Sequence, residues 1–271
     1  MPEEEKKKIS QSADALEDDF YEIEDTFSDT EHVVEEDATA VVAGKKRKAE
    51  QKKEKKKKKA RQSDDPYGHM NIWTESVETQ YGYVADRQKK ALPKLSAVEY
   101  EEQALVKEAF VNNEKFTSEH VLEALPNYIK FGVATHKKLA KAPTELARPV
   151  ALVITHSAVR AVDLVRALKE FNQTAKIAKL FAKHMKVEEQ IYFLEKQPIH
   201  LGVGTPNRIK ALIEQGHLHL DRLELIVIDT ERNAKRFNIF DNDNVRGDLF
   251  SLLGSHIADR MQKGQTKLGL F

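Results

Sequence analysis

Short apolar runs alternate with amphipathic stretches after Pro149. Each run has the length of a strand that is buried on both faces, and the stretches between the runs carry apolar residues at helical spacing. The pattern predicts strands at 151–154, 176–181, 199–204 and 223–229, and helices at about 158–171, 186–196 and 206–215. A last helix at about 244–261 and a strand at 267–271 follow. This alternation predicts an α/β fold with a parallel sheet flanked by helices.

Two further helices are expected before Pro149. The first begins with the capping-box pair Ser96 and Glu99. Its apolar face would carry Leu105, Ala109 and Phe110. The second begins near Ser118, and Pro126 interrupts its pattern. Its apolar positions are Val121, Leu122 and Leu125.

Aromatic residues become frequent just after Pro66, at Tyr67, Trp73, Tyr81 and Tyr83. Their irregular spacing, with glycine and proline nearby, favours an extended segment that wraps the domain over a regular helix. Stacking on nucleic-acid bases is a second interpretation, but few basic residues interleave with these aromatics. We therefore expect them to anchor the segment to the domain.

The charges are separated along the chain, although the formal net charge is zero. Residues 1–44 form an acidic arm, residues 45–65 form a lysine-rich linker, and residues 66–271 would form the folded domain. Blocks of like charge repel themselves, so both N-terminal blocks are expected to be disordered.

The lysine-rich linker is typical of a nuclear or nucleolar localisation signal with non-specific RNA affinity. A run that serves only solubility is the alternative interpretation. The basic residues concerned are Lys45, Lys46, Arg47, Lys48, Lys55, Lys56, Lys57, Lys58 and Lys59.

Four apolar residues of the acidic arm recur at helical spacing: Leu16, Phe20, Ile23 and Phe27. They favour a short amphipathic helix that docks into an apolar groove with a basic rim on a partner protein. An unfolded segment that screens the adjacent lysines is nearly as good an interpretation.

The composition excludes several classes of protein. The chain has no cysteine, which rules out disulfides and thiolate metal sites. The histidines lack the spacing of a ligand set, so no metal site is expected. No apolar run has the length of a membrane span, and the acidic start is unlike a signal peptide, so we expect a soluble intracellular protein with no membrane partner.

Candidate phosphate-binding turns follow two of the predicted strands. Ser157 precedes a helix with Arg160 in its first turn, and Thr205 precedes a helix with Pro206 at its first position and Arg208 nearby. The free amides of a helix N-terminus attract anions, and an arginine adds a formal charge. We expect both hydroxyl side chains to cap their helices. Both turns would lie at carboxyl ends of parallel strands, where α/β proteins bind ligands.

The same residues resemble the first RecA-like domain of DEAD-box RNA helicases. The stretch LGVGTPNRIKALIEQGHLHLDRLELIVIDTERN, residues 201–233, is similar to the part that runs from motif Ib (TPGR) to motif II (DEAD). ALVITHSAVRA looks like the motif Ia strand and turn, and QTKLGLF looks like the strand before motif III. The resemblance therefore implies a RecA-like domain.

The departures from the helicase pattern imply a lost ATPase. The degenerate motif II reads Asp229, Thr230, Glu231 and Arg232. A threonine thus stands where the family has the glutamate that positions the attacking water. The Walker A pattern GxxxxGK[ST] occurs nowhere, and the chain stops before motif III and the second RecA-like domain. Phosphoryl transfer depends on positioning and charge stabilisation, so we expect no ATPase activity and no cofactor.

Over nearly the whole chain, the acidic start, the lysine-rich linker and the helicase-like segments resemble the CMS1 family of U3-containing 90S pre-ribosomal complex subunits. The resemblance implies a nucleolar factor of early small-subunit assembly, with pre-rRNA or snoRNA and processome proteins as partners. The resemblance to DEAD-box helicases implies that the residues of motifs Ia and Ib contact the RNA backbone. Those residues are Thr155, His156, Ser157, Arg160, Thr205, Pro206, Asn207 and Arg208.

Two other functions are kept as alternatives. One is a nucleotide-responsive ATPase in which Asp229 binds Mg²⁺ and a partner subunit completes the site. The other is a protein-interaction scaffold without RNA contact.

Overall fold

A five-stranded parallel sheet lies at the centre of the unit Met70–Phe271 in the computed structural model, which describes residues 65–271 except 69, 184 and 235. The strands are β1 (Ala151–Ile154), β2 (Lys176–Leu180), β3 (Ile199–Gly204), β4 (Leu225–Ile228) and β5 (Lys267–Leu270). Their order across the sheet is β2-β3-β1-β4-β5. Every pairing is parallel, which confirms the predicted α/β class.

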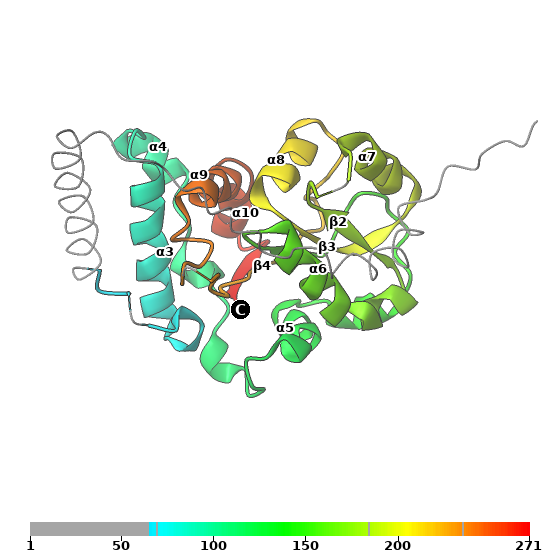
Figure 1. Ribbon diagram of the computed structural model, residues 1–271, viewed down its shortest axis with the longest axis horizontal. Coiled ribbons are helices and arrows are strands. Elements are labelled where there is room, and N and C mark those ends of the chain that lie inside the picture. Colours follow the sequence, from blue (N-terminus) through cyan, green and yellow to red (C-terminus); the bar gives the residue numbers. More distant parts are fainter. Residues whose placement is uncertain (1–64, 69, 184, 235) are drawn as a thin grey trace, which may run out of the picture. The chain divides into compact units, whose positions relative to one another are not determined.

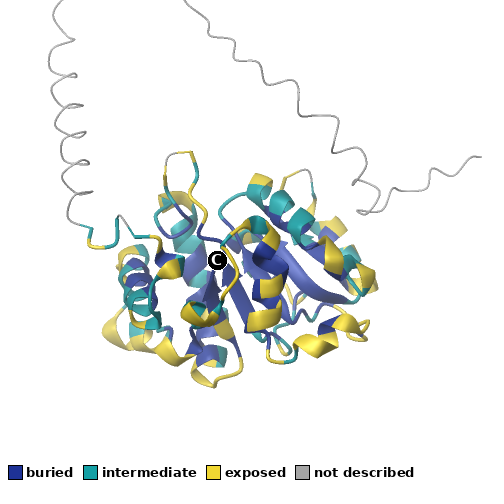
Figure 2. Ribbon diagram, turned by 90° about the horizontal axis from the view of Figure 1, so that it is seen from below, coloured by how far each residue is buried: buried dark blue, intermediate teal, exposed yellow. Residues whose placement is uncertain are grey.

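The three central strands β1, β3 and β4 are buried along their entire length. Burial on both faces explains why they consist of apolar runs instead of alternating residues. Alternate residues, such as Val153, Val203 and Val227, belong to a core shared with the helices on one face of the sheet. Figure 2 shows this buried layer between exposed outer surfaces.

The helices that connect the strands lie close to their predicted positions. They are α6 (Ala158–Ala167), α7 (Val187–Lys196) and α8 (Pro206–Glu214). Helix α6 packs on one face of the sheet beside α5 (Leu125–Gly132), and α8 packs against α9 (Asp243–Leu252). Figure 1 shows α8, α9 and α10 (Ala258–Gln262) on the side of the sheet opposite α5 and α6. The predicted last helix is interrupted by a π-helical turn at Leu253–Ile257.

The segment after Pro66 differs from the prediction, because it contains a regular 15-residue helix, α3 (Val77–Ala91). Ser76 caps this helix by accepting a hydrogen bond from the N–H of Thr79. Its buried face includes Gln80, Arg87 and Gln88, whose polar groups hydrogen-bond to neighbouring segments. A helix that buries polar side chains shows little apolar periodicity, so the pattern did not reveal it.

The helix that begins at Ser96 is shorter than predicted. Its capping box is confirmed, but α4 (Ala97–Glu102) ends after six residues. Phe110 lies beyond it and forms an isolated parallel bridge with Leu268 of β5. The apolar residues that the prediction placed on one helix face are therefore buried, but they belong to an irregular segment.

The second early helix begins later than predicted. A 3₁₀ turn at Leu122–Ala124 leads into α5, and Pro126 occupies the first turn of that helix. Proline is favoured there, because the first N–H groups of a helix need no intrahelical partner. Further 3₁₀ turns lie at Ile72–Thr74, Lys107–Ala109, Asn113–Lys115, His136–Ala140 and Lys169–Gln173.

The acidic arm and the lysine-rich linker up to residue 64 lie outside the described residues. Among the residues that are described, none of the helices has the length and apolar character needed to cross a membrane.

Candidate nucleic-acid interface

The predicted site residues follow the carboxyl ends of β3, β1 and β4, which are neighbours in the sheet. Adjacent strands are about 4.8 Å apart, so the three loops lie along one edge. The structure thus brings together the segments resembling motifs Ia, Ib and II. The directions of individual side chains decide what this edge can do.

The turn after β1 has the predicted cap. Ser157 accepts a hydrogen bond from the N–H of Arg160 at 3.3 Å, at the start of α6. The preceding Thr155 is buried, and its hydroxyl donates to Oδ2 of Asp229 at 2.7 Å. Burial lowers the pKa of His156. Its Nδ1 has no hydrogen-bond partner among the described residues.

Arg160 points inward and holds Asp229 with two nitrogens. Its Nε lies 3.1 Å from Oδ2, and its Nη2 lies 3.0 Å from Oδ1. The Asp229 side chain is 1% exposed and that of Arg160 is 20% exposed. Burial opposes the charge of Arg160, but the hydrogen bonds and charge of Asp229 outweigh it and raise the arginine pKa. Each group therefore neutralises the other within the fold.

The turn after β3 differs from its predicted form in one respect. Pro206 stands in the first turn of α8, as expected, but the Thr205 side chain makes no cap hydrogen bond. The backbone N–H of Thr205 donates to the carbonyl of Leu180, the last residue of the neighbouring strand β2. Asn207 is exposed at this helix start.

Arg208 also makes internal contacts. Its Nη1 donates to Oε1 of Gln190 at 2.8 Å and to the carbonyl of Met185 at 3.3 Å. Gln190 is buried and donates to the carbonyls of Lys179 and Phe181. Arg208 therefore ties α8 to the segment around α7.

The residues after Asp229 have separate environments. Thr230 is buried, and its N–H and hydroxyl both donate to the carbonyl of Phe271, joining the ends of β4 and β5. Glu231 and Arg232 are exposed. Arg232 donates to the carbonyl of Met70 at 3.0 Å.

An aromatic stack lies at the end of β5, and sequence reasoning did not assign it to the site. The rings of Trp73 and His120 are 3.7 Å apart and nearly parallel, and Phe271 lies 4.3 Å from His120 on centroid distances. Asn113 donates to the carbonyls of Trp73 and Leu270. The stacking agrees with the interpretation of Trp73 as an anchor.

His120 connects this stack to the ion pair. Burial lowers its pKa to about 4, and the charges of Asp229 and Arg160 are close enough to act on it. Its Nε2 has no hydrogen-bond partner among the described residues. No sequence motif marked His120, because its contacts come from segments far apart in the chain.

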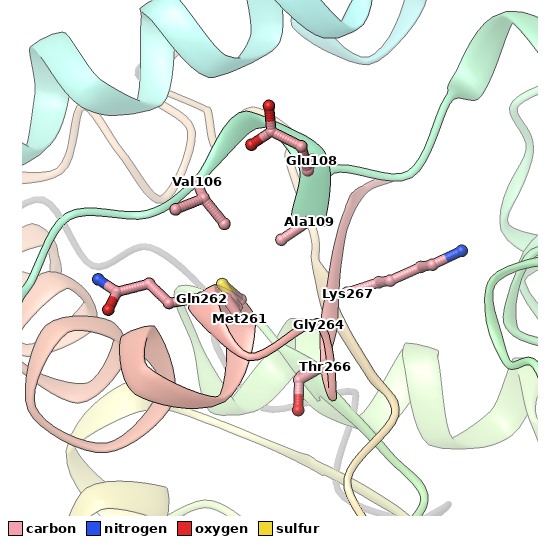
Figure 3. A pocket seen from close by; sticks show the side chains of 8 residues that line it. All are labelled: Val106, Glu108, Ala109, Met261, Gln262, Gly264, Thr266 and Lys267. Carbon is pink, nitrogen blue, oxygen red and sulfur yellow. The ribbon is translucent and has the colours of Figure 1, made fainter.

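A cavity of about 210 Å³ lies away from this edge, between β5 and α10 (Figure 3). Lys267, the first residue of β5, lines it together with Val106, Ala109 and Met261. It therefore lies near the amino end of β5, whereas the candidate interface lies at the carboxyl ends of the strands.

Comparison with known proteins gives a family match and several relatives. The CMS1 family model, described as a U3-containing 90S pre-ribosomal complex subunit, matches residues 25–271. Protein CMSS1 of Homo sapiens is 40% identical over 149 residues, which are 55% of this chain and 53% of that protein. Protein CMSS1 of Xenopus laevis is 35% identical over 195 residues, 70% of this chain and 69% of that protein. The match thus spans about half the length of the human relative.

A fungal relative and a solved structure also match. Protein CMS1 of Chaetomium thermophilum is 34% identical over 173 residues, covering 63% of this chain and 69% of that protein. A structure of Saccharomyces cerevisiae Dbp5 bound to Nup159, Gle1, IP6 and ADP aligns with 15% identity and a TM-score of 0.38. That alignment covers 69% of this chain and 45% of the Dbp5 chain.

Proposed function

Because this chain belongs to the CMS1 family of U3-containing 90S pre-ribosomal complex subunits, we propose that it is a non-catalytic assembly factor of the early small ribosomal subunit. Residues 66–271 would act as a degenerate RecA-like helicase domain that holds the backbone of pre-rRNA. Membership in the 90S pre-ribosome implies a place in the nucleus and nucleolus.

The observation that carries the non-catalytic assignment is the closed environment of Asp229. In DEAD-box helicases the corresponding aspartate contacts Mg²⁺. Here Arg160 and Thr155 engage both of its carboxylate oxygens, and the side chain is 1% exposed. A metal ion would have to displace an arginine whose own charge is balanced by this carboxylate, which makes binding unfavourable.

The neighbouring positions support the same conclusion. Thr230 replaces the glutamate of motif II, and its hydroxyl is used to hold the end of β5. The stack of Trp73, His120 and Phe271 fills the space at the end of that strand. The residues nearest to Asp229 therefore serve internal packing and hydrogen bonding.

The proposed contact with RNA rests on the family and on the location of the motifs. The segments that resemble motifs Ia and Ib lie side by side at the carboxyl edge of a parallel sheet, where α/β proteins bind ligands. Contacts with sugar and phosphate supply affinity and position but no sequence specificity. We infer that neighbouring proteins or base pairing define the target within the pre-ribosome.

Thermal unfolding with ATP and Mg²⁺ tests the non-catalytic assignment. A nucleotide at about one hundred times its dissociation constant stabilises a protein by about 2.7 kcal/mol, which would raise Tm by several degrees. We expect no such shift for the full chain. A shift that disappears in Asp229→Asn would contradict the proposal and support an ATPase completed by a partner.

Crosslinking to RNA in cells tests the second half of the proposal. We expect crosslinks to pre-rRNA that map to residues in the unit Met70–Phe271 as well as to the lysine-rich linker. Crosslinks confined to the linker would instead support a protein-interaction scaffold.

A further inference from the structure

We propose that Lys137, Lys138 and Lys141 form a second binding site for the RNA phosphate backbone, at the amino ends of the strands. The three lysines lie in or directly after the 3₁₀ helix His136–Ala140, so a single turn of the chain carries all of them. The inference rests on the proposed function, because it adds an RNA contact that lies outside the helicase-like motifs.

Hydrogen bonds fix both ends of this lysine turn at the amino end of the sheet. Before the turn, the N–H and the hydroxyl of Thr135 donate to the two carboxylate oxygens of Glu224 at 2.9 and 2.6 Å. Glu224 directly precedes β4. After the turn, Nε2 of the buried His200 donates to the carbonyl of Lys141 at 2.6 Å, and His200 is the second residue of β3. The lysine turn therefore lies at the opposite end of the strands from the segments resembling motifs Ia, Ib and II.

The middle of the lysine turn is held as well. Leu139 is 3% exposed and belongs to the core that the sheet shares with α5 and α6. Its carbonyl accepts a hydrogen bond from the Thr174 hydroxyl at 2.9 Å. Because the backbone is fixed at three points, RNA binding would not have to order it first, which lowers the entropic cost of binding.

The lysine turn presents three charges that the fold does not neutralise. All three lysines are exposed. Among the described residues, no carboxylate forms an ion pair with any of the three ammonium groups. The carboxylates of the adjoining segments have other partners, which are Arg148 and Arg222 for Glu145, Lys130 for Glu170, and Thr135 for Glu224. The turn is therefore a fixed patch of positive charge.

The spacing of the lysines suits a nucleic-acid backbone. Lys138 and Lys141 are three positions apart, and the N–H of Lys141 donates to the carbonyl of Lys138 at 3.0 Å. Three residues of a 3₁₀ helix rise about 6 Å. Phosphates along one strand of a nucleic-acid helix follow one another at about 3.4 Å along the axis. Phosphates of a few consecutive nucleotides could thus contact different lysines of the turn.

RNA fits the lysine turn better than an acidic peptide does. A peptide helix that docks on a protein usually inserts apolar anchors. Between the lysines the exposed residue is Ala140, which offers little apolar surface, whereas Leu139 is buried. Phosphate contacts need only donors and positive charge. The family description, a U3-containing 90S pre-ribosomal complex subunit, also places the chain in a particle that contains RNA.

A second contact would change what the domain does with RNA. Strand β1 has four residues and is therefore about 13 Å long. The helicase-like motifs lie at one end of this length and the lysine turn lies at the other. With contacts at both ends, the domain would hold two segments of RNA together.

Lysine acetylation with and without RNA tests the inference, because mass spectrometry measures each lysine separately from the linker. The full chain is mixed with a short oligouridylate and then treated briefly with an acetylating reagent. We expect the RNA to protect Lys137, Lys138 and Lys141, and salt to remove this protection. The internal control is a second group of exposed lysines with similar spacing on α3 and the residues after it: Lys89, Lys90 and Lys94. In that group Lys90 pairs with Asp86 at 2.7 Å, and we expect no protection.

Matched variants measure the contribution of the lysine turn to affinity. All of them carry serine in place of Lys55 to Lys59, so that the linker binds less RNA. The test variant combines Lys137→Gln, Lys138→Gln and Lys141→Gln, and the control combines Lys89→Gln, Lys90→Gln and Lys94→Gln. Binding of the labelled oligouridylate is followed by fluorescence anisotropy. Each lost contact lowers the slope of log affinity against log salt by about 0.7, so we expect a decrease of about 2 in the test variant and none in the control.

Each other outcome overturns the inference in a distinct way. Equal protection of both lysine groups, or equal slopes for two variants that circular dichroism shows to be folded, would reveal binding without a defined site. An oligouridylate that binds but leaves the lysine turn reactive would overturn the inference and leave the proposed RNA function intact. Stronger protection by polyglutamate of the same charge would assign the turn to an acidic protein. No binding by the parent chain would overturn the RNA function as well.

Discussion

Replacing Arg160 with methionine should strongly destabilise the protein, because it removes the main partner of a buried carboxylate. Methionine keeps an unbranched apolar stem of similar reach but has no charge and no N–H donor. Asp229, which is 1% exposed, would keep the hydrogen bond from the Thr155 hydroxyl. The carboxylate would then lack its positively charged partner in a poorly solvated place, which is unfavourable.

The expected loss can be estimated from the geometry. Breaking a buried ion pair by removing one partner costs about 3–5 kcal/mol. Arg160 is 20% exposed, so water can reach part of the gap, and we expect about 3 kcal/mol at neutral pH. Asp229→Asn should cost less, about 1–2 kcal/mol, because Thr155 can still donate to the amide oxygen and the arginine stays partly solvated.

The double variant separates the ion pair from general damage to packing. Arg160→Met leaves the Asp229 carboxylate without its charged partner, but the double variant has no carboxylate at this position. The loss of stability in the double variant should therefore be smaller than the sum of the two single losses, by at least about 2 kcal/mol. Urea unfolding of the full chain, followed by circular dichroism, measures all three values. A loss below about 1 kcal/mol for Arg160→Met, or strict additivity in the double variant, would refute the assigned role of the pair.

Three further outcomes follow from the structure. The pKa of His120 falls from 6.5 to about 4 in the folded state, so the unfolded chain binds the proton first as pH falls, and stability should decline from about pH 6.5 to 4. In His120→Phe the free energy of unfolding, measured by urea unfolding at several pH values, should decline less steeply over this range. An unchanged slope would argue against the role of His120 in the decline. Thr230→Val should cost about 1–2 kcal/mol by leaving a buried carbonyl with one donor fewer, while Thr230→Glu should produce no ATPase in a phosphate-release assay. Gly204→Ala should destabilise by about 1–3 kcal/mol, since the added methyl meets the Leu180 backbone, whereas Gly247→Ala should stabilise α9 by up to about 1 kcal/mol because nothing lies near it. Equal changes in Tm for Gly204→Ala and Gly247→Ala would contradict these two expectations.

The sequence predicted the sheet well because its central strands are buried on both faces. Runs such as Ala151–Ile154 and Leu225–Ile228 leave no other way to bury so many consecutive apolar residues in short segments. The segment after Pro66 gave no such signal. Helix α3 docks through Arg87 and Gln88, which are of residue types that usually lie at the surface. Their hydrogen-bond partners, Asp241 and the carbonyl of Gln103, lie 154 and 15 positions away in the chain, so no local pattern marks them as interior.

The location of the candidate site was predictable, but the directions of its side chains were not. Parallel strands bring their carboxyl ends to one edge, so the turns at Ser157 and Thr205 had to lie on the same edge of the sheet. The contact between Arg160 and Asp229 joins residues 69 positions apart in the chain. An arginine that follows a helix cap gives the same local signal whether it points to solvent or to a buried carboxylate.

Trp73 is the single tryptophan of the chain, and it stacks on His120 beside the end of β5. Its emission therefore reports on one known place in the molecule without any label. Spectral changes on assembly with RNA or protein would reveal whether the packing at that place survives incorporation into the larger particle, so the protein contains its own optical probe.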